Sequence, residues 1–131
     1  MGFLLDTNHL SVLVNDPNGR CAQRIRRAAE QAFTSVIVVA EVRFGLAKRP
    51  SARLEELTEA VISAIKVEPW ESPADIRYAE IRAYLERSGT PISANDMLIA
   101  AHALALDATI VTANEREFRR VPGLNVENWA S

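Results

Sequence analysis

Short apolar segments alternate with longer segments of helical periodicity along the whole chain, and this alternation restricts the folds open to it. The apolar segments at 2–5, 32–35, 108–112 and 124–126 have the length and composition of buried strands, and another strand begins at Val67. Strands that alternate with helices form parallel sheets covered on both faces. The sequence therefore predicts a small three-layer α/β fold with a parallel sheet of about four or five strands, whose order the sequence leaves open.

Helices are predicted between these strands from the spacing of apolar residues and from capping residues. They cover residues 7–14, 20–31, 36–48, 51–66, 75–87, 95–106 and 115–120. Helix 36–48 is apolar on most sides and helix 95–106 almost entirely so, which predicts that both are buried. Helix 51–66 begins at a Ser51 cap, and its inner face is expected to carry Leu54, Leu57, Val61, Ile62 and Ile65.

The composition is that of an ordinary folded protein. With 131 residues, 48% of them hydrophobic and 24% charged, the chain is expected to form one domain, residues 1–131. Its apolar runs are far shorter than the ~20 residues of a membrane-spanning helix, and the amino terminus does not resemble a secretion signal. Cys21 is the only cysteine, which excludes an internal disulfide and predicts a reducing, cytoplasmic location.

Asp6 follows the first apolar segment directly, in the stretch LLDTN, although neither a strand nor a core favours aspartate. In an open parallel sheet, functional side chains gather beyond the carboxyl ends of the strands. One interpretation is that Asp6 caps the next helix. The other is that Asp6 belongs to a site at this edge of the sheet, in which case other acids must join it there.

Glu41 and Asp96 are the two further acids placed for such a site. Glu41 lies in the apolar segment SVIVVAEVRFGLA, so its carboxylate is expected to be partly buried, with an ion pair to a nearby arginine as the structural alternative. Asp96 fits a variant of the capping box that begins at Ser93, and its place in the first turn of a helix directs it toward the same sheet edge as Asp6. Three converging carboxylates repel one another unless a positive group lies among them.

The segment VTANEREF adds candidates beyond the end of a later strand. Asn114 is a candidate cap for the helix that starts at Glu115, whereas Glu117 is able to face either the site or solvent. One of Asn114 and Glu117 is expected to touch the site, with Glu117 carrying the charge.

The histidines and tryptophans are expected to have structural roles. His102 lies among apolar residues of helix 95–106 and is interpreted as a core histidine with its hydrogen bonds satisfied, and His9 is placed on a helix surface. Trp70 and Trp129 are interpreted as packing residues. The sequence contains no glycine-rich phosphate loop, no zinc spacing of cysteine and histidine, and no nucleophile elbow.

Positive charge is carried almost entirely by arginine, since Lys48 and Lys66 are the only lysines among fifteen cationic residues. The formal net charge of −2 gives no general signal for nucleic-acid binding. The arginines cluster, however, within 20–27, 43–53 and 116–120. Guanidinium groups suit phosphate or carboxylate partners, and the alternative of solvated helix faces stays equally open.

Taken together, three stretches resemble PIN-domain ribonucleases of the VapC type, the toxins of bacterial type II toxin–antitoxin modules. These stretches are LLDTNHLS, SVIVVAEVRFGLA and GTPISANDMLIAAHALALDATIVTANEREFRRVPGLNVENW. The resemblance extends from Phe3 to Trp129, and the ordered set of motifs is specific where DTN alone is weak. It implies a PIN-like fold and a metal-dependent endoribonuclease that hydrolyses phosphodiester bonds in structured RNA, either tRNA or rRNA.

The resemblance also implies the chemistry of the site. Mg²⁺, or Mn²⁺ in its place, would be held by Asp6 and Asp96 with Glu41 completing the negative pocket. Many family members have a fourth acid where this chain has Asn114, so the fourth position falls to Asn114 or to Glu117. Near the rim, Arg43, Arg116 and Arg119 are the candidates for holding the RNA backbone.

The implied partners are an inhibitory antitoxin of the VapB type and a second copy of the chain, paired through the early helices and joined with antitoxin in a hetero-oligomer. Two other functions are open at this stage. One is a PIN-fold interaction protein with little or no catalysis, which the missing fourth acid favours. The other is an aspartate-based phosphatase, against which Asn8 stands where that chemistry places a second aspartate.

Overall fold

The computed structural model describes residues 2–130, and at its centre lies a five-stranded parallel sheet. The strands are β1 (Phe3–Leu5), β2 (Ala32–Ser35), β3 (Lys66–Glu68), β4 (Thr109–Val111) and β5 (Val126–Glu127). They lie in the order β3-β2-β1-β4-β5, and every neighbouring pair is parallel. The predicted fold class is confirmed, and the strand order is now fixed.

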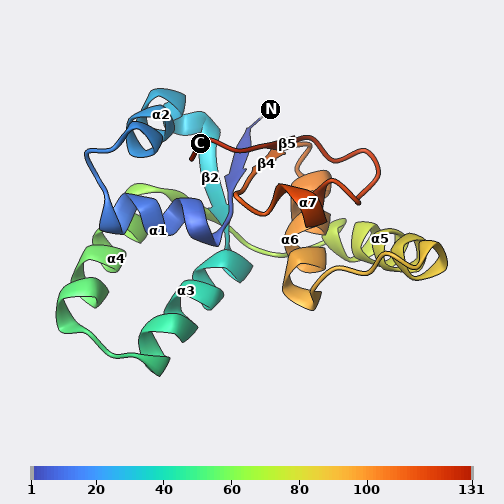
Figure 1. Ribbon diagram of the computed structural model, residues 1–131, viewed down its shortest axis with the longest axis horizontal. Coiled ribbons are helices and arrows are strands. Elements are labelled where there is room, and N and C mark those ends of the chain that lie inside the picture. Colours follow the sequence, from blue (N-terminus) through green and yellow to red (C-terminus); the bar gives the residue numbers. More distant parts are fainter. Residues whose placement is uncertain (1, 131) are drawn as a thin grey trace.

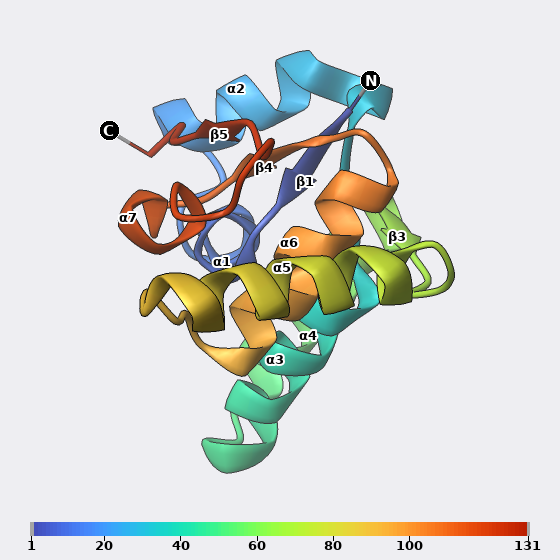
Figure 2. The same cartoon turned by 90° about the vertical axis from the view of Figure 1, so that its right-hand side faces the viewer.

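Seven helices flank this sheet in the described residues. They are α1 (Thr7–Asn15), α2 (Arg20–Ala28), α3 (Val36–Lys48), α4 (Ala52–Ala64), α5 (Ala74–Ser88), α6 (Ala94–Ala105) and α7 (Glu115–Phe118), with a 3₁₀ turn η1 (Ala29–Gln31) after α2. Figure 1 shows the strands between α1 and α2 on one side and α5 and α6 on the other. Figure 2 shows α5 crossing in front of α6, so that α5 forms the outer part of its layer.

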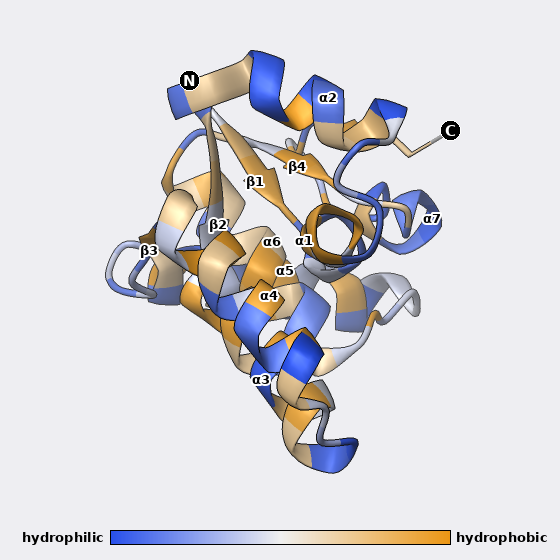
Figure 3. Cartoon of the chain, turned by 90° about the vertical axis from the view of Figure 1, so that its left-hand side faces the viewer, coloured by the Kyte–Doolittle hydropathy of each residue, from blue (hydrophilic) through white to orange (hydrophobic). Residues whose placement is uncertain are grey.

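Two apolar clusters divide the core between the two faces of the sheet. Leu4 and Ile110 belong to the larger cluster, together with apolar residues of α5, α6 and α7. Leu5 and Val111, one position further along each strand, belong to the smaller cluster with Cys21 and other residues of α2. Because successive strand residues point to opposite faces, two adjacent leucines serve two different layers. Figure 3 shows the resulting hydropathy, with apolar strands and hydrophilic residues on the outer side of α2.

Helix α3 is not buried along its whole length, contrary to the sequence prediction. Val38 and Val39 are buried, but Phe44 is 67% exposed and Gly45 is also exposed. Figure 1 gives the reason, because α3 starts at the sheet and then runs away from it beside α4. Only its first turns reach the core, whereas an apolar sequence alone does not reveal the direction in which a helix leaves a sheet.

Two other helices also differ in detail from the prediction. Helix α2 ends at Ala28 rather than at residue 31, because Ala29 has a φ of 52° and turns the chain toward β2. On α4 and its caps, Leu54, Val61, Ile62 and Ile65 are partly buried as predicted, whereas Leu57 is 36% exposed and Thr58, which the prediction left out, is 3% exposed. The predicted cap is present, since the Leu54 N–H donates to Ser51 Oγ at 3.3 Å. Within the part of the chain described, no helix is both long and apolar enough to cross a membrane.

The strand order places the carboxyl ends of β1 and β4 side by side at the centre of the sheet. From β1 the chain adds β2 and β3 on one side, and it later adds β4 and β5 on the other. Leu5 at the end of β1 pairs with Val111 at the end of β4. Open α/β sheets bind ligands at this kind of switch point. The residues that follow Leu5 and Val111 are therefore the candidates for a functional site.

We expect Ser35→Ala to destabilise the protein by about 2 kcal/mol, since it removes a helix cap and also the partner of a buried imidazole. Ser35 Oγ accepts from the Ile37 N–H at 3.0 Å and lies 2.7 Å from His102 Nδ1. Urea denaturation measures the difference. Ser51→Ala is the matched control, because Ser51 caps α4 without a buried partner and its loss is expected to cost about 1 kcal/mol. Equal losses for the two variants would contradict the role of the imidazole contact.

Candidate active site

Asp6 lies at the switch point and is both a helix cap and a buried acid. Its Oδ1 accepts from the Thr7 N–H at 2.8 Å, and its Oδ2 accepts from Thr112 Oγ1 at 2.7 Å. Only 5% of the residue is exposed. Burial raises the pKa of Asp6, as does the negative charge of Glu41, whereas the hydrogen bonds from Thr112 and Thr7 oppose that rise. The two interpretations of Asp6 as cap and as site residue are therefore compatible.

Glu41 reaches the same edge from α3. Its Oε1 accepts from Thr7 Oγ1 at 2.8 Å, and its Oε2 accepts from Asn95 Nδ2 at 3.2 Å. The predicted partial burial is confirmed. The alternative of an ion pair with arginine is wrong within residues 2–130, because both partners are neutral. Thr7 thus joins Glu41 to the strand end that carries Asp6.

Asp96 and Glu117 form a carboxyl pair joined by Asn114. The Asn114 Nδ2 donates to Asp96 Oδ2 at 3.0 Å and to Glu117 Oε2 at 2.9 Å. Asn114 occupies the cap position of α7, but its side chain makes no capping hydrogen bond, so the expectation of an ordinary cap is wrong. The predicted Ser93 cap is present, since Ser93 Oγ accepts from the Asp96 N–H at 3.3 Å.

The pKa values of the two carboxyls are shifted in opposite directions. Burial, the hydrogen bond with Glu117 and the negative charge of Asp6 together raise the pKa of Asp96 to about 7. The pKa of Glu117 is lowered, because Asp96 and Asn114 both donate hydrogen bonds to it. Asp96 therefore binds a proton below about pH 7 in the metal-free protein, whereas Glu117 carries the charge. The pair resists full ionisation unless a positive group joins it.

The acids are arranged as pairs rather than as a tight triad. Among residues 2–130, no three Asp, Glu, His or Cys side chains lie close enough together to hold one metal ion. Mg²⁺ prefers oxygen donors and is commonly held by one or two carboxylates, with water in its other positions. The donor set at this edge is oxygen only, and burial together with the charge of Asp6 makes ionisation of Asp96 unfavourable without a cation. Asp6 and Asp96 therefore fit a Mg²⁺ ion that retains most of its water.

The three candidate arginines differ in their surroundings. Arg43 is paired with Glu59, and Arg119 is paired with Glu115 at 2.9 Å, both on the surface. Arg116 is exposed and makes no side-chain hydrogen bond or ion pair with any described residue. Exposed ion pairs contribute little energy, so these pairs do not prevent Arg43 and Arg119 from meeting a phosphate. Arg116 is free to do so without breaking any contact.

The histidines depart from the sequence prediction, while the tryptophans agree with it. His9 is fully buried rather than on a helix surface, and burial lowers its pKa to about 4. His102 is buried as predicted, but its Nε2 has no hydrogen-bond partner among the described residues. Trp129 packs against Phe3 with ring centroids 5.0 Å apart, and the Trp70 indole N–H donates to the Leu98 carbonyl at 2.9 Å.

Sequence reasoning missed the neutral side chains that hold the acids, namely Thr7, Asn95 and Thr112. None of them has a distinctive residue type or spacing. The available signal was positional, because Thr7 and Asn95 lie beside an acid at the start of a helix and Thr112 follows the end of a strand. Proximity of Thr112 to Asp6 depends on the pairing of β1 with β4, which the sequence did not reveal.

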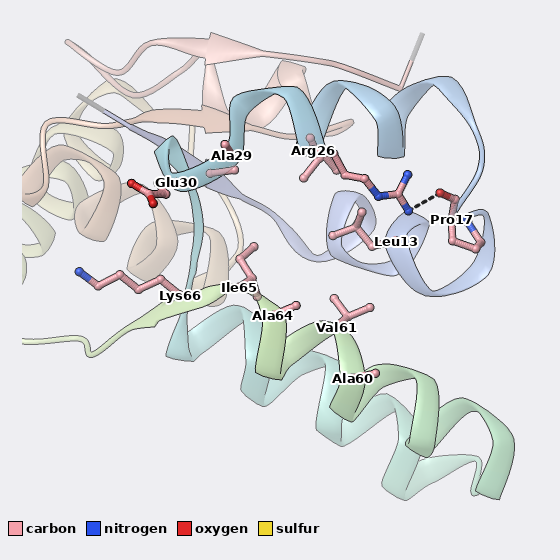
Figure 4. A pocket seen from close by; sticks show the side chains of 12 residues that line it. Leu13, Pro17, Arg26, Ala29, Glu30, Ala60, Val61, Ala64, Ile65 and Lys66 are labelled. Carbon is pink, nitrogen blue, oxygen red and sulfur yellow. Dashed lines mark hydrogen bonds between the residues drawn. The ribbon is translucent and has the colours of Figure 1, made fainter.

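A cavity of about 910 Å³ lies away from the acids, between α2 and α4. Figure 4 shows Leu13, Val61 and Ile65 at its walls, with Lys66 and Glu30 at one end and the hydrogen bond from Arg26 to the Pro17 carbonyl at the other. None of the candidate acids lines it. An apolar lining suits an apolar ligand or peptide rather than metal-assisted chemistry. We call this cavity the α2–α4 groove.

Comparisons with known proteins agree with this geometry. The model of the PIN domain family matches residues 3–124. Ribonuclease VapC2 of Rickettsia felis is 32% identical over 132 residues, which cover 98% of each chain, and tRNA(fMet)-specific endonuclease VapC of Salmonella typhimurium is 33% identical over 129 residues, or 97% of each. Among solved structures, VapBC2 from Rickettsia felis, bound to a promoter DNA fragment, matches with a TM-score of 0.91 at 32% identity over 98% of this chain and 99% of that chain. DNA-bound VapBC from Salmonella typhimurium matches with a TM-score of 0.89 at 32% identity, over 99% of each.

We expect the metal-free protein to lose stability as the pH rises from 3.8, the ordinary pKa of an aspartate, to about 7, the pKa of Asp96 in the folded protein. The folded-state pKa of about 7 lies above the unfolded value, so the folded state binds the proton more tightly and its advantage is lost as pH rises through 7. The Asp96→Asn variant lacks this ionisation, so it loses less stability. The Tm of the variant minus the Tm of the parent is therefore expected to be larger at pH 8 than at pH 5. Thermal unfolding in chelator at both pH values measures it, with Asp107→Asn as the matched exposed control. A Tm difference between Asp96→Asn and the parent that does not change with pH would contradict the raised pKa of Asp96.

Proposed function

This chain belongs to the PIN-domain family of VapC ribonucleases, and from that premise we propose that it is a toxin that hydrolyses phosphodiester bonds in structured RNA with the help of Mg²⁺. The observation that carries the proposal is the gathering of acids at the β1–β4 switch point. Asp6, Glu41 and Asp96 come from three distant segments, and hydrogen bonds from Thr7, Asn95 and Asn114 hold them at one edge. The relatives named for a tRNA substrate support tRNA as the RNA class.

Each residue has a distinct part in the proposed chemistry. Asp6 and Asp96 hold Mg²⁺, or Mn²⁺ in its place, which supplies Lewis acidity at the phosphodiester. Glu41 has an ionisable carboxylate at the rim of the same edge, where it orients a water molecule and accepts its proton. Asn114 and Glu117 keep Asp96 in place. Arg116, with Arg43 and Arg119, binds phosphates of the RNA backbone.

Asp96 also makes cation binding depend on pH. A carboxyl with a pKa of about 7 must release its proton before it ligates a cation. Occupancy by Mg²⁺ would therefore rise with pH through neutrality, as Asp96 loses its proton. A cation at this edge would offset the charge of carboxylates that have no ion pair with arginine or lysine.

We further propose a VapB-type antitoxin as inhibitor and a homodimer joined into a toxin–antitoxin hetero-oligomer. Solved VapBC complexes of Rickettsia felis and Salmonella typhimurium, in each of which one chain is matched over nearly its whole length, support the antitoxin. The dimer is proposed to use the early helices. The buried free thiol of Cys21 suits the reducing cytoplasm, where the RNA substrates are found.

We expect Asp6→Asn and Asp96→Asn each to lower metal-dependent RNA cleavage about 100-fold or more, because each removes a carboxylate from the proposed cation site. Cleavage of labelled tRNA in Mg²⁺ measures activity, and circular dichroism checks that the fold is intact. Asp107→Asn is the matched control, since Asp107 is exposed and carries no part of the site. Full activity of either site variant would refute the proposed chemistry. An inactive parent chain would favour the interaction-protein alternative.

We expect the small protein encoded next to this chain to co-purify with it and to suppress cleavage at equimolar ratio. Size-exclusion chromatography with light scattering also reports the mass of the isolated chain, which is expected to be twice the 14.5 kDa of one copy. A stable complex without loss of cleavage would argue against inhibition. A clean 14.5 kDa species would remove the dimer while leaving the nuclease proposal intact.

A further inference from the structure

A chain of hydrogen bonds runs from the C-terminal segment to the loop that carries Asn114, and His9 lies at its centre. The Trp129 N–H donates to His9 Nε2 at 3.1 Å. On the other side of the ring, His9 Nδ1 lies 2.9 Å from Asn8 Oδ1. That same oxygen accepts from the Ala113 N–H at 3.2 Å. His9 thus connects residue 129 to residue 113 through one imidazole and one amide.

The partners of His9 determine its protonation state. A backbone N–H such as that of Trp129 is only a donor, so Nε2 must present its lone pair and the ring proton must lie on Nδ1. An Nδ1–H is itself only a donor, which requires an acceptor on Asn8. The Asn8 amide therefore turns its oxygen toward His9 and Ala113. One tautomer and one amide orientation satisfy all three contacts.

A rigid anchor is needed because Asn8 is exposed. A lone asparagine on the surface exchanges between orientations at little cost, so its contact with Ala113 would be weak by itself. His9 is fully buried, and its partner Trp129 is fixed by Phe3 on one side and by the Arg24 guanidinium, 4.9 Å from the ring centroid, on another. The buried imidazole of His9 therefore restricts the orientation of the exposed Asn8 amide.

The loop held by Asn8 organises the acids. Thr112 donates to Asp6, and Asn114 donates to Asp96 and to Glu117. Ala113 lies between these two residues. Its N–H donates to Asn8, a side chain outside the loop. A shift at Ala113 would move the hydroxyl on one side and the amide on the other.

We propose that His9 is a positioning residue for the active site, acting through Asn8 on the 112–114 loop. It touches neither substrate nor cation. Its Nδ1–H fixes the Asn8 oxygen, the oxygen fixes Ala113, and Thr112 and Asn114 thereby keep Asp6 and Asp96 at the spacing that the site requires. The inference rests on the proposed nuclease function, although its structural part is testable without activity.

Three substitutions separate positioning from simple filling of the core. His9→Asn places an amide N–H where Nδ1 stood, which preserves the donor to Asn8 and gives up the Trp129 contact. His9→Gln reaches the Nε2 position, which preserves an acceptor for Trp129 and gives up the donor to Asn8. His9→Phe retains ring volume and makes neither bond. Ile81→Ala in α5, a helix that carries no site residue, is the control for loss of stability alone.

The first readouts need no catalysis. Long-range ¹H–¹⁵N spectra of the parent are expected to show the Nδ1–H tautomer of His9, and hydrogen exchange reports the Ala113 amide. We expect His9→Phe and His9→Gln to speed exchange at Ala113 and to weaken Mn²⁺ binding by calorimetry, each by about 10-fold or more. His9→Asn is expected to stay close to the parent in both, even where its Tm is lower. Ile81→Ala is expected to lower Tm with Ala113 exchange and Mn²⁺ affinity unchanged.

Cleavage of tRNA then links positioning to chemistry. We expect kcat to fall about 10-fold or more in His9→Phe and His9→Gln, with KM little changed. We expect His9→Asn to retain the kcat of the parent. Equal behaviour of Asn, Gln and Phe, or an Nε2–H tautomer in the parent, would overturn the inference. A parent that fails to cleave RNA but shows the expected pattern at Ala113 and for Mn²⁺ would refute the proposed function and leave the positioning role standing.

Discussion

The accumulation of carboxylates at one edge of a small sheet is the constraint on which the rest of this structure depends. Asp6, Glu41, Asp96 and Glu117 meet there, and the groups that contact them are neutral hydroxyls and amides rather than arginines. Hydrogen bonds fix the positions of these acids without cancelling their charge. The pKa of Asp96 is raised chiefly by burial, then by the hydrogen bond with Glu117 and by the negative charge of Asp6. The divalent cation proposed for this edge would offset that charge and would use the same oxygens as ligands.

The sheet brings these acids together because strand order reverses at β1. The strands β1 and β4 have three residues each, so the segments that follow them begin close to the core, and the contact between Thr112 and Asp6 follows directly from the pairing of Leu5 with Val111. Glu41 comes from a helix that begins at the end of the neighbouring strand β2. The repulsion among the acids is confined to this edge, because two apolar clusters on opposite faces stabilise the rest of the sheet.

Two surfaces of different chemistry lie apart on this chain. The acidic edge is polar and suits a cation and phosphate, whereas the α2–α4 groove is apolar and contains none of the acids. Exposed Phe44 on the projecting half of α3 adds a further apolar surface.

The sequence by itself determined the parallel α/β class, nearly all helices, and the acids Asp6, Glu41 and Asp96 as candidates, since strand and helix periodicity and out-of-place charges are local signals. Their shared edge, the pairing of Glu117 with Asp96 and the roles of Thr7, Thr112 and Asn95 depended on strand order and on the direction of α3, which local patterns do not encode. His9 illustrates the difference, because its sequence neighbours suggest a helix surface. Only the packing of the C-terminal segment makes it a buried link, since burial arises from contacts between residues 120 positions apart.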